Sequence, residues 1–409
     1  MKNYCYLGLI SILLCCGTSK QENNNVNADT SNLVKSDTLV KSENQTTVTK
    51  IVLPKNDTLD EMAKIIAGIK EDNPKVLGQI FRKKSFSNYS GLFEGSWRKF
   101  DSLRSPQLES FRSGKLNQIV GKTNTLFYPF SGPDFLYANS FFPDADTYIM
   151  MGLEPVGTLP FIDQKSMIND SIGNYFLELK QSLNSIMSSS FFKTISMHSD
   201  FRRKQLDGTL HVLLLFIKRT GHDICSVKPG SIDTNGIWQY QSGFPAMAKS
   251  NLNNKGIEIK FTNKSGQLKT LYFFSLNLQD NALKSNKNLT NFFAKLGEVN
   301  TYLKGASYLM HRSDFSEIRR VIFDHSNYIM QDDSGIAMAY FKSSGFRWDY
   351  SLFGKYTRPI PLFAARYQPE LDSMWKSKGS TPLGFGLGYN SYDNNSNLLI
   401  AKKLGKNNK

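Results

Sequence analysis

Hydrophobic residues are grouped along the chain in a pattern that predicts alternating strands and helices. An apolar strand is expected over residues 125–130, a turn over 131–134, an apolar and aromatic helix over 135–142, and a second strand over 147–154. A helix between two such strands brings them into parallel pairing, because the connection must cross the sheet. The segment therefore predicts a βαβ unit near residues 125–154.

The second half of the chain adds antiparallel structure. Residues 257–261 alternate apolar and polar side chains, residues 263–266 are typical of a turn, and residues 268–278 form the return strand of a β-hairpin. The apolar run over residues 210–217 is too short for its periodicity to distinguish a buried strand from a helix. Residues 165–205 carry apolar side chains at helical spacing. The predicted fold class is α/β, with a mixed sheet flanked by helices.

The amino-terminal residues carry a targeting signal. Lys2 precedes an apolar run from Tyr4 to Cys16, which is shorter than the ~20 residues needed to span a bilayer and fits a secretory signal peptide. The end of this run, Leu13-Leu14-Cys15-Cys16-Gly17, resembles the lipobox of bacterial lipoprotein signal peptides. The resemblance implies cleavage before Cys16 and lipid attachment to Cys16; Cys15 is the alternative attachment residue. We therefore expect a lipid-anchored protein at the periplasmic or outer-membrane face of the cell envelope.

Composition divides the chain into a tether and a body. The segment after Cys16 is rich in Asn, Ser, Thr and Lys, and no aromatic residue occurs between Tyr6 and Phe81. Such a segment buries too little apolar surface to offset the entropy lost on ordering. We expect four parts, namely a signal peptide (1–15), a lipid-anchored disordered tether (16–56), a globular α/β body that forms one domain (57–392) and a basic tail (393–409). The last eight residues of that tail are expected to be frayed.

Charge and cysteine content narrow the range of partners. Lys and Arg number 50 and Asp and Glu number 35, so the chain carries +15, or +14 without residues 1–15, which hold one charge. Because a positive surface favours anionic partners, we expect an anionic glycan or an envelope protein, besides the membrane reached through the lipid, and no nucleic acid. Cys225 is the single cysteine of the body, which excludes a disulfide within it and a zinc site built on several cysteines. No metal site is predicted.

Glu154 follows Gly132 by 22 residues and stands at the carboxyl end of the second predicted strand. This arrangement resembles the first βαβ unit of class I methyltransferases, a Rossmann-type domain in which a Gly-rich turn approaches the cofactor and an acid after the second strand binds ribose hydroxyls. An exported protein would not meet S-adenosylmethionine or NAD in useful amounts. We therefore expect no cofactor and interpret the unit as architectural, with a site for another ligand at its strand ends.

Four side chains are candidates for acid–base chemistry: Asp134, Glu154, His222 and Asp332. Asp134 begins the predicted helix, where a carboxylate also caps the first turn. His222 is adjacent to Asp223, and Asp332 opens an Asp-Asp-Ser-Gly turn that is equally typical of a structural Asx turn. The sequence does not show which of these side chains lie together.

These observations favour a cell-envelope lipoprotein that binds a ligand or a partner, with no catalysis indicated. One alternative is an envelope hydrolase that uses the carboxylates with His222 or His311. An ordered acidic and basic cleft at the carboxyl edge of the sheet would favour it. Another is a degenerate methyltransferase-like domain without cofactor, which a filled turn at Gly132 would favour. A shallow aromatic groove near Trp348, where aromatic residues interleave with Arg and Lys, would favour glycan or protein binding.

Overall fold

The fold is given by a computed structural model. The signal peptide, the lipobox with Cys16, the tether up to residue 52 and most of the helix expected over residues 165–205 lie outside the described residues. Residues 51–409 form one compact unit. The structure describes residues 53–159, 173, 175–177, 208–243, 255–390 and 396–407.

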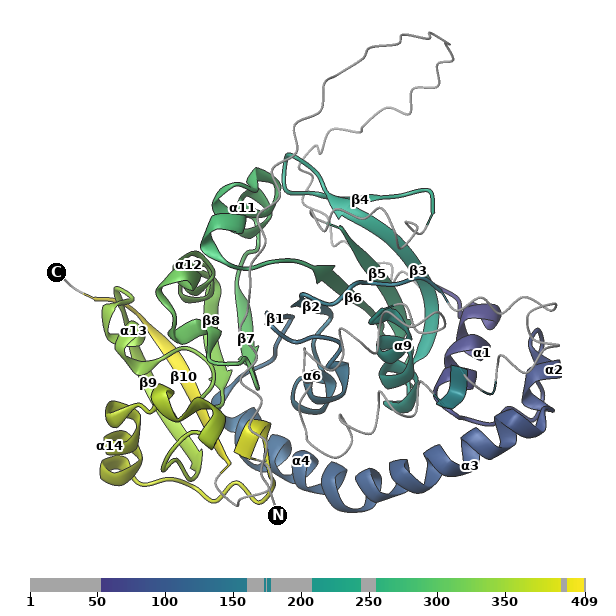
Figure 1. Ribbon diagram of the computed structural model, residues 1–409, viewed down its shortest axis with the longest axis horizontal. Coiled ribbons are helices and arrows are strands. Elements are labelled where there is room, and N and C mark those ends of the chain that lie inside the picture. The colour runs from purple at the N-terminus through teal and green to yellow at the C-terminus, as the bar shows by residue number, and fades with distance from the viewer. Residues whose placement is uncertain are drawn as a thin grey trace, which may run out of the picture. The chain divides into compact units, whose positions relative to one another are not determined.

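A ten-stranded mixed sheet lies at the centre of the described part of the chain (Figure 1). Its strand order is β4-β3-β5-β6-β2-β1-β7-β8-β10-β9. The central strands β6, β2, β1, β7 and β8 are parallel, whereas both flanks contain antiparallel pairs, which confirms the predicted α/β class with a mixed sheet. The strands are β1 (Thr125–Tyr128), β2 (Thr147–Gly152), β3 (Asp223–Ile232), β4 (Trp238–Tyr240), β5 (Lys255–Thr262), β6 (Leu268–Ser275), β7 (Val299–Leu303), β8 (Ser326–Gln331), β9 (Phe346–Gly354) and β10 (Asn397–Lys406).

Helices cover both faces of the sheet and pack two hydrophobic cores. Side chains alternate along β2, where Tyr148 and Met150 enter one core and Ile149 and Met151 enter the other. The first core is covered by α1 (Asp57–Ile66), α2 (Gly78–Phe81), α3 (Lys84–Lys99), α4 (Ser105–Phe111), α5 (Asn117–Ile119), α6 (Phe135–Phe141) and α9 (Leu210–Arg219). The second core is covered by α10 (Asp280–Lys284), α11 (Lys287–Ala294), α12 (Ser316–His325), α13 (Met338–Ser343) and α14 (Pro369–Lys378).

Shorter helical turns complete the described part. Two π-helical turns, η1 (Phe100–Arg104) and η2 (Arg112–Leu116), interrupt the helical segment that runs from α3 through α4 to α5. Since α4 packs against α6, this long segment forms an outer row beside α6 and α9 (Figure 1). The 3₁₀ turns are η4 (Leu309–His311), η5 (Ser313–Phe315), η6 (Pro361–Arg366) and η7 (Gly388–Asn390).

Both supersecondary units expected from the sequence are present. β1 and β2 pair in parallel with α6 between them, and β5 and β6 pair antiparallel around a turn in which the Gly266 N–H donates to the Asn263 carbonyl. The apolar run over residues 210–217 is a helix, α9. It contacts α1, α6 and β3, and every residue from Leu210 to Lys218 is buried, which explains why its sequence has no polar face.

The expectation of a basic tail outside the body is wrong for residues 397–406, which form strand β10, and so is the expected fraying as far as residue 406. This strand pairs antiparallel with β8 on one side and with β9 on the other. Residues from Asn397 to Ala401 are buried because they have a strand on each side and a helical layer on each face. The lysines that suggested a solvated tail follow at the outer end of the strand.

A buried ion pair fastens α1 to α9 and β3. Asp60 is fully buried and accepts hydrogen bonds from the Lys218 Nζ at 2.6 Å and from the Ile224 N–H at 3.0 Å. Lys218 also reaches Asp223 at 2.6 Å. Desolvation offsets much of the attraction in a buried pair, but loss of one partner leaves a buried charge uncompensated. The pair therefore fixes the position of α1.

We expect Asp60→Asn to lower the free energy of unfolding by about 3 kcal/mol, because the Lys218 ammonium group loses its buried partner and keeps only the half-exposed Asp223. Asp57→Asn is the matched control, since Asp57 pairs with Lys75 at 2.8 Å on the surface and surface pairs contribute about 0–1 kcal/mol. Urea unfolding followed by circular dichroism measures both changes. Equal losses in the two variants would contradict the role assigned to Asp60.

Candidate functional site

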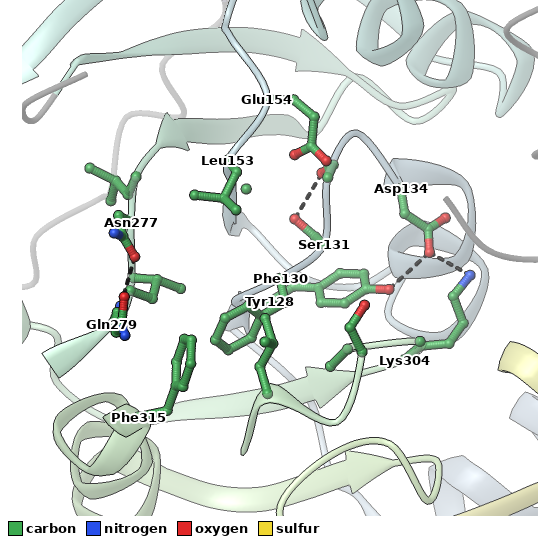
Figure 2. Close-up of a pocket in the computed structure, with 18 residues that line it drawn as sticks. Tyr128, Phe130, Ser131, Asp134, Leu153, Glu154, Asn277, Gln279, Lys304 and Phe315 are labelled. Atoms are coloured by element: carbon green, nitrogen blue, oxygen red, sulfur yellow. Dashed lines mark hydrogen bonds and ion pairs between the residues drawn. The ribbon is translucent and has the colours of Figure 1, made fainter. Parts of the chain in front are cut away.

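A pocket of about 250 Å³ lies at the carboxyl ends of β1, β2, β6 and β7 (Figure 2). The chain leaves β1 towards β2 and β6 on one side, and the later strands β7 and β8 are added on the other side. The strand order therefore reverses between β1 and β7. In open α/β sheets, this reversal opens a crevice in which ligands bind. The pocket occupies that place in the fold.

The pocket walls are mainly apolar, with a few polar groups. The Phe130 and Phe315 rings stand at one end, with centroids 5.9 Å apart. At another side, the backbone N–H of Gln279 donates to Asn277 Oδ1 at 3.0 Å, and Gln279 Nε2 donates to Asp314 Oδ2 at 2.6 Å, so both side-chain amides are held in place. A mainly apolar cavity with a few fixed polar groups is typical of small-molecule sites. Lining side chains include Phe130, Leu153, Leu276, Leu278, Leu309 and Phe315, with Ser131, Asp134, Glu154, Asn277, Gln279, Lys304 and Ser307.

Asp134 connects three elements at the reversal point. Its Oδ1 accepts the Tyr137 N–H at 3.3 Å and so caps α6, as its place before the helix suggested. Its Oδ2 accepts the Tyr128 hydroxyl of β1 at 2.9 Å and pairs with the Lys304 Nζ, just after β7, at 2.6 Å. Burial raises the pKa of the Asp134 carboxyl, and Lys304 opposes that rise. Asp134 is thereby committed to holding β1, α6 and β7 together.

Lys304 is a member of the site that sequence analysis missed. Its side chain is 2% exposed, and its Nζ lies 3.7 Å from the centre of the Tyr137 ring as well as against Asp134. Burial lowers the pKa of Lys304, while the Asp134 carboxylate acts in the opposite direction. A single lysine after a strand matches no motif, and the pairing becomes visible only when β7 is placed beside β1.

Glu154 packs against the glycine turn that follows β1. A Cβ atom on Gly152 would stand 2.3 Å from the Glu154 carboxylate and 3.2 Å from the Gly132 Cα, so position 152 admits no side chain. Gly132 itself has a φ of 51°, in the left-handed region that glycine adopts freely. Glu154 is 3% exposed. The structure thus brings Glu154, Gly132 and Asp134 to one edge of the sheet (Figure 2).

Asp332 supports the pocket wall from behind and does not line the cavity. Its Oδ2 accepts the Gly305 N–H at 2.9 Å, and its Oδ1 accepts the Ser334 N–H at 3.0 Å in an Asx turn. The Ser334 hydroxyl oxygen accepts the Ala306 N–H at 2.8 Å. The turn after β8 therefore holds the segment that follows Lys304.

His222, the fourth candidate, lies away from the pocket. Its ring packs against Phe135 and Phe261, at centroid distances of 6.0 and 5.0 Å. Burial, reinforced by the nearby Lys269, lowers the pKa of His222 to about 4, so the ring is neutral at physiological pH. Asp223 points to Lys218 instead. His222 is therefore not the histidine that the hydrolase hypothesis requires. His311, the alternative, packs against the Tyr308 ring at a centroid distance of 5.0 Å and does not line the pocket.

The aromatic segment near Trp348 forms an edge strand packed on the core. Trp348 is half-buried against Phe323 and Phe341, at centroid distances of 5.8 and 5.4 Å, and its Nε1–H donates to the Ser344 hydroxyl at 3.0 Å. Its ring is used in packing, so this strand does not present the shallow aromatic groove that would favour glycan stacking.

Backbone strain is concentrated at the pocket. Within the described ranges, the non-glycine residues with positive φ are Phe130 at 61°, Ser307 at 52° and Tyr308 at 53°. Phe130 and Ser307 line the cavity, and Tyr308 follows directly. Each such conformation costs on the order of 1–3 kcal/mol and persists only where the surroundings impose it, commonly at functional sites. The Ser307 and Tyr389 hydroxyls, 2.9 Å apart, form one of the contacts that impose it here.

A second carboxylate, that of Asp333, holds the strained residue Tyr308. It accepts the Tyr308 hydroxyl through Oδ2 and the Asn397 Nδ2–H through Oδ1 at 3.0 Å. Burial and the neighbouring Asp332 raise the pKa of Asp333 to about 7. The support behind the pocket wall thus contains two adjacent buried carboxylates, one of which titrates near neutral pH.

Comparisons of the chain with protein-family models, with curated proteins and with solved structures find no match. Among the described residues, no helix is long and apolar enough to cross a bilayer. Likewise, no three His, Cys, Asp or Glu side chains of the described ranges gather as ligands of one metal ion would.

Asp333→Asn is expected to change how stability depends on pH. The pKa of Asp333 is about 7 in the folded protein against 3.8 for the free group. Its contribution to stability is therefore complete below pH ~4 and is lost as pH rises through ~7. Because the amide does not titrate, the Tm of the variant relative to the natural protein should be higher at pH 8 than at pH 4.5. Asp349→Asn, on the exposed edge strand, is the control. Parallel Tm profiles of Asp333→Asn and the natural protein would contradict the assignment.

Proposed function

We propose that this protein is a lipid-anchored protein of the cell envelope that binds a small, mainly apolar ligand in the pocket between β1 and β7. The proposal is carried by the backbone strain gathered at that pocket, since Phe130 and Ser307 hold unfavourable conformations where they line it. The position at the carboxyl ends of parallel strands and the apolar walls agree with it.

The location rests on the sequence. The apolar run that ends at Cys15-Cys16-Gly17 supports lipid attachment at Cys16, and the polar segment after it supports a tether that holds the body clear of the bilayer. The charge of +15 for the whole chain supports an anionic glycan or an envelope protein as a further partner.

A degenerate methyltransferase-like domain without cofactor is a second candidate for the same pocket. It is supported by the turn at Gly132, against which the Glu154 carboxylate packs, and by the ion pair of Asp134 with Lys304 at the strand ends. Binding without catalysis is common to both candidates. An envelope hydrolase is less well supported, because Asp134 is committed to Lys304, His222 lies elsewhere, and the described lining residues include no His or Cys.

Leu153→Trp tests the pocket as a binding site. Leu153 lines the cavity yet is 47% exposed, so the larger ring should occlude the pocket without disturbing the core. Leu92→Trp makes the same change at an exposed position of α3 that does not line the pocket. With indole as an apolar probe and saturation-transfer NMR on the full chain, we expect Leu153→Trp to weaken binding about tenfold, a loss of ~1.4 kcal/mol. Equal indole binding by both variants would contradict the proposal.

Cys16→Ala tests the anchor. When the chain is produced in a bacterium supplied with an alkyne-labelled fatty acid, we expect the natural protein and Cys15→Ala to take up the label and to sediment with membranes. Cys16→Ala should do neither, because a thiol is needed for the attachment. Labelling that depends on Cys15 alone would move the attachment by one residue, and labelling of neither position would contradict the anchor.

A further inference from the structure

A second cavity, of about 290 Å³, lies among the helices on the face of the sheet that α6 and α9 cover. Its walls come from α3, α4 and α6, the carboxyl end of α9 and the turn between β5 and β6. It shares no lining residue with the pocket between β1 and β7. An inference about this cavity therefore does not rest on ligand binding in that pocket, although it rests on the anionic glycan proposed above as a partner.

Two π-helical turns shape one wall of this cavity. η1 contributes Phe100 and Asp101, η2 contributes Arg112, and α4 between them contributes Glu109. A π turn inserts one residue into a helix and redirects the side chains that follow, and such turns occur frequently at functional sites. Here the two turns direct both charged and aromatic residues of one helical segment towards the same cavity.

The lining holds three positive side chains, Arg112, Arg219 and Lys264, and two negative ones, Asp101 and Glu109. Arg112 is paired with Glu109, and Arg219 is paired with Glu94 outside the lining. Lys264 makes no ion pair with any described residue, and its side chain crosses Gly221 at the rim, where a Cβ atom would stand 3.1 Å from the lysine Cε. Asp101 lies near Arg219, which counteracts the rise in its pKa caused by burial.

Arg219 is built into the wall. Its side chain is 6% exposed, its Nε–H donates to the Ala67 carbonyl at 2.7 Å, and its Nη1–H donates to Glu94 at 2.8 Å. The guanidinium group lies over the Trp97 ring at 5.3 Å from the ring centre. Its Nη2 is buried without an acceptor among the described residues. Arg219 is thus a fixed cation of the wall, with Glu94 as its counter-ion.

The remaining lining groups suit a polar ring rather than a bare anion. Phe100 is half-buried beside Trp97, with ring centroids 5.2 Å apart, and offers an aromatic surface. Ser105, Asn139 and Ser140 add hydroxyl and amide groups. The volume is close to the lower end of the ~300–1,000 Å³ range of small-molecule sites, which fits a ligand of one ring.

From this combination we infer that the second cavity binds an acidic sugar, a single pyranose ring that carries a carboxylate. The carboxylate lies towards Lys264 and the guanidinium groups, an apolar face of the ring lies on Phe100, and the hydroxyls meet Asn139 and Asp101. This assignment gives the positive charge of the body one defined place at which an anionic glycan is recognised.

Isothermal titration of the full chain with glucuronate and with glucose tests the inference. The two probes have the same ring and differ in the carboxylate, so we expect glucuronate to bind at least about tenfold more tightly. Lys264→Gln should weaken glucuronate binding about fivefold and leave glucose unchanged, and added salt should weaken glucuronate binding further. Lys287→Gln, which removes an exposed lysine from α11, is the control and should behave as the natural protein.

Two results would overturn the inference: equal affinity for the two sugars, or equal loss in Lys264→Gln and Lys287→Gln. Asn139→Leu tests the polar contacts separately from the charge. It should weaken the binding of both sugars, which an effect of charge alone would not do. Leu153→Trp should leave glucuronate binding intact. If Leu153→Trp abolishes it, the sugar occupies the pocket between β1 and β7, and the second cavity is not the site.

Discussion

The buried pair of Asp134 and Lys304 is the interaction on which the central part of the fold depends. It joins the start of α6, the end of β1 through the Tyr128 hydroxyl and the residue after β7. Desolvation consumes most of the attraction in such a pair, so its net stabilisation is small, whereas removal of one partner costs about 3–5 kcal/mol. The pair therefore contributes little to the stability of the fold, and its main effect is to favour one arrangement of the strands at the reversal point. Both residues line the pocket.

The wall after Lys304 is rigid because it is supported from behind. Asp332 and Ser334 take the N–H groups of Gly305 and Ala306, and Asp333 takes the Tyr308 hydroxyl. These contacts offset the cost of the left-handed conformations of Ser307 and Tyr308. A cavity whose wall is held in this way is formed before any ligand arrives, so binding loses little conformational entropy.

Features of the fold that depend on a local sequence pattern could be predicted from the sequence alone. The strands β1 and β2, the helix α6 and the hairpin of β5 and β6 follow from periodicity and turn residues, and Asp134 follows from its place before a helix. Glu154 could be placed near Gly132 because a βαβ unit brings both to one edge.

Features that depend on long-range pairing could not be predicted in the same way. Lys304 meets Asp134 only because β7 lies beside β1, and Asp332 reaches the pocket only through Gly305. β10 was missed because its lysines dominate the composition of residues 397–406, although the apolar run from Leu398 to Ala401 is a signal for a buried strand. His222 was overvalued because its aromatic neighbours, Phe135 and Phe261, are distant from it in sequence.

The position of β10 has a consequence for how the protein is made. This strand is synthesised after all the others, yet it is inserted between β8 and β9, which do not pair with each other. A nascent chain that has not reached residue 397 therefore carries two open strand edges at this end of the sheet, and open edges pair readily with other chains. Completion of this flank must therefore follow synthesis of residues 397–406. β10 thus closes both edges at once, because its two sides pair with β8 and with β9.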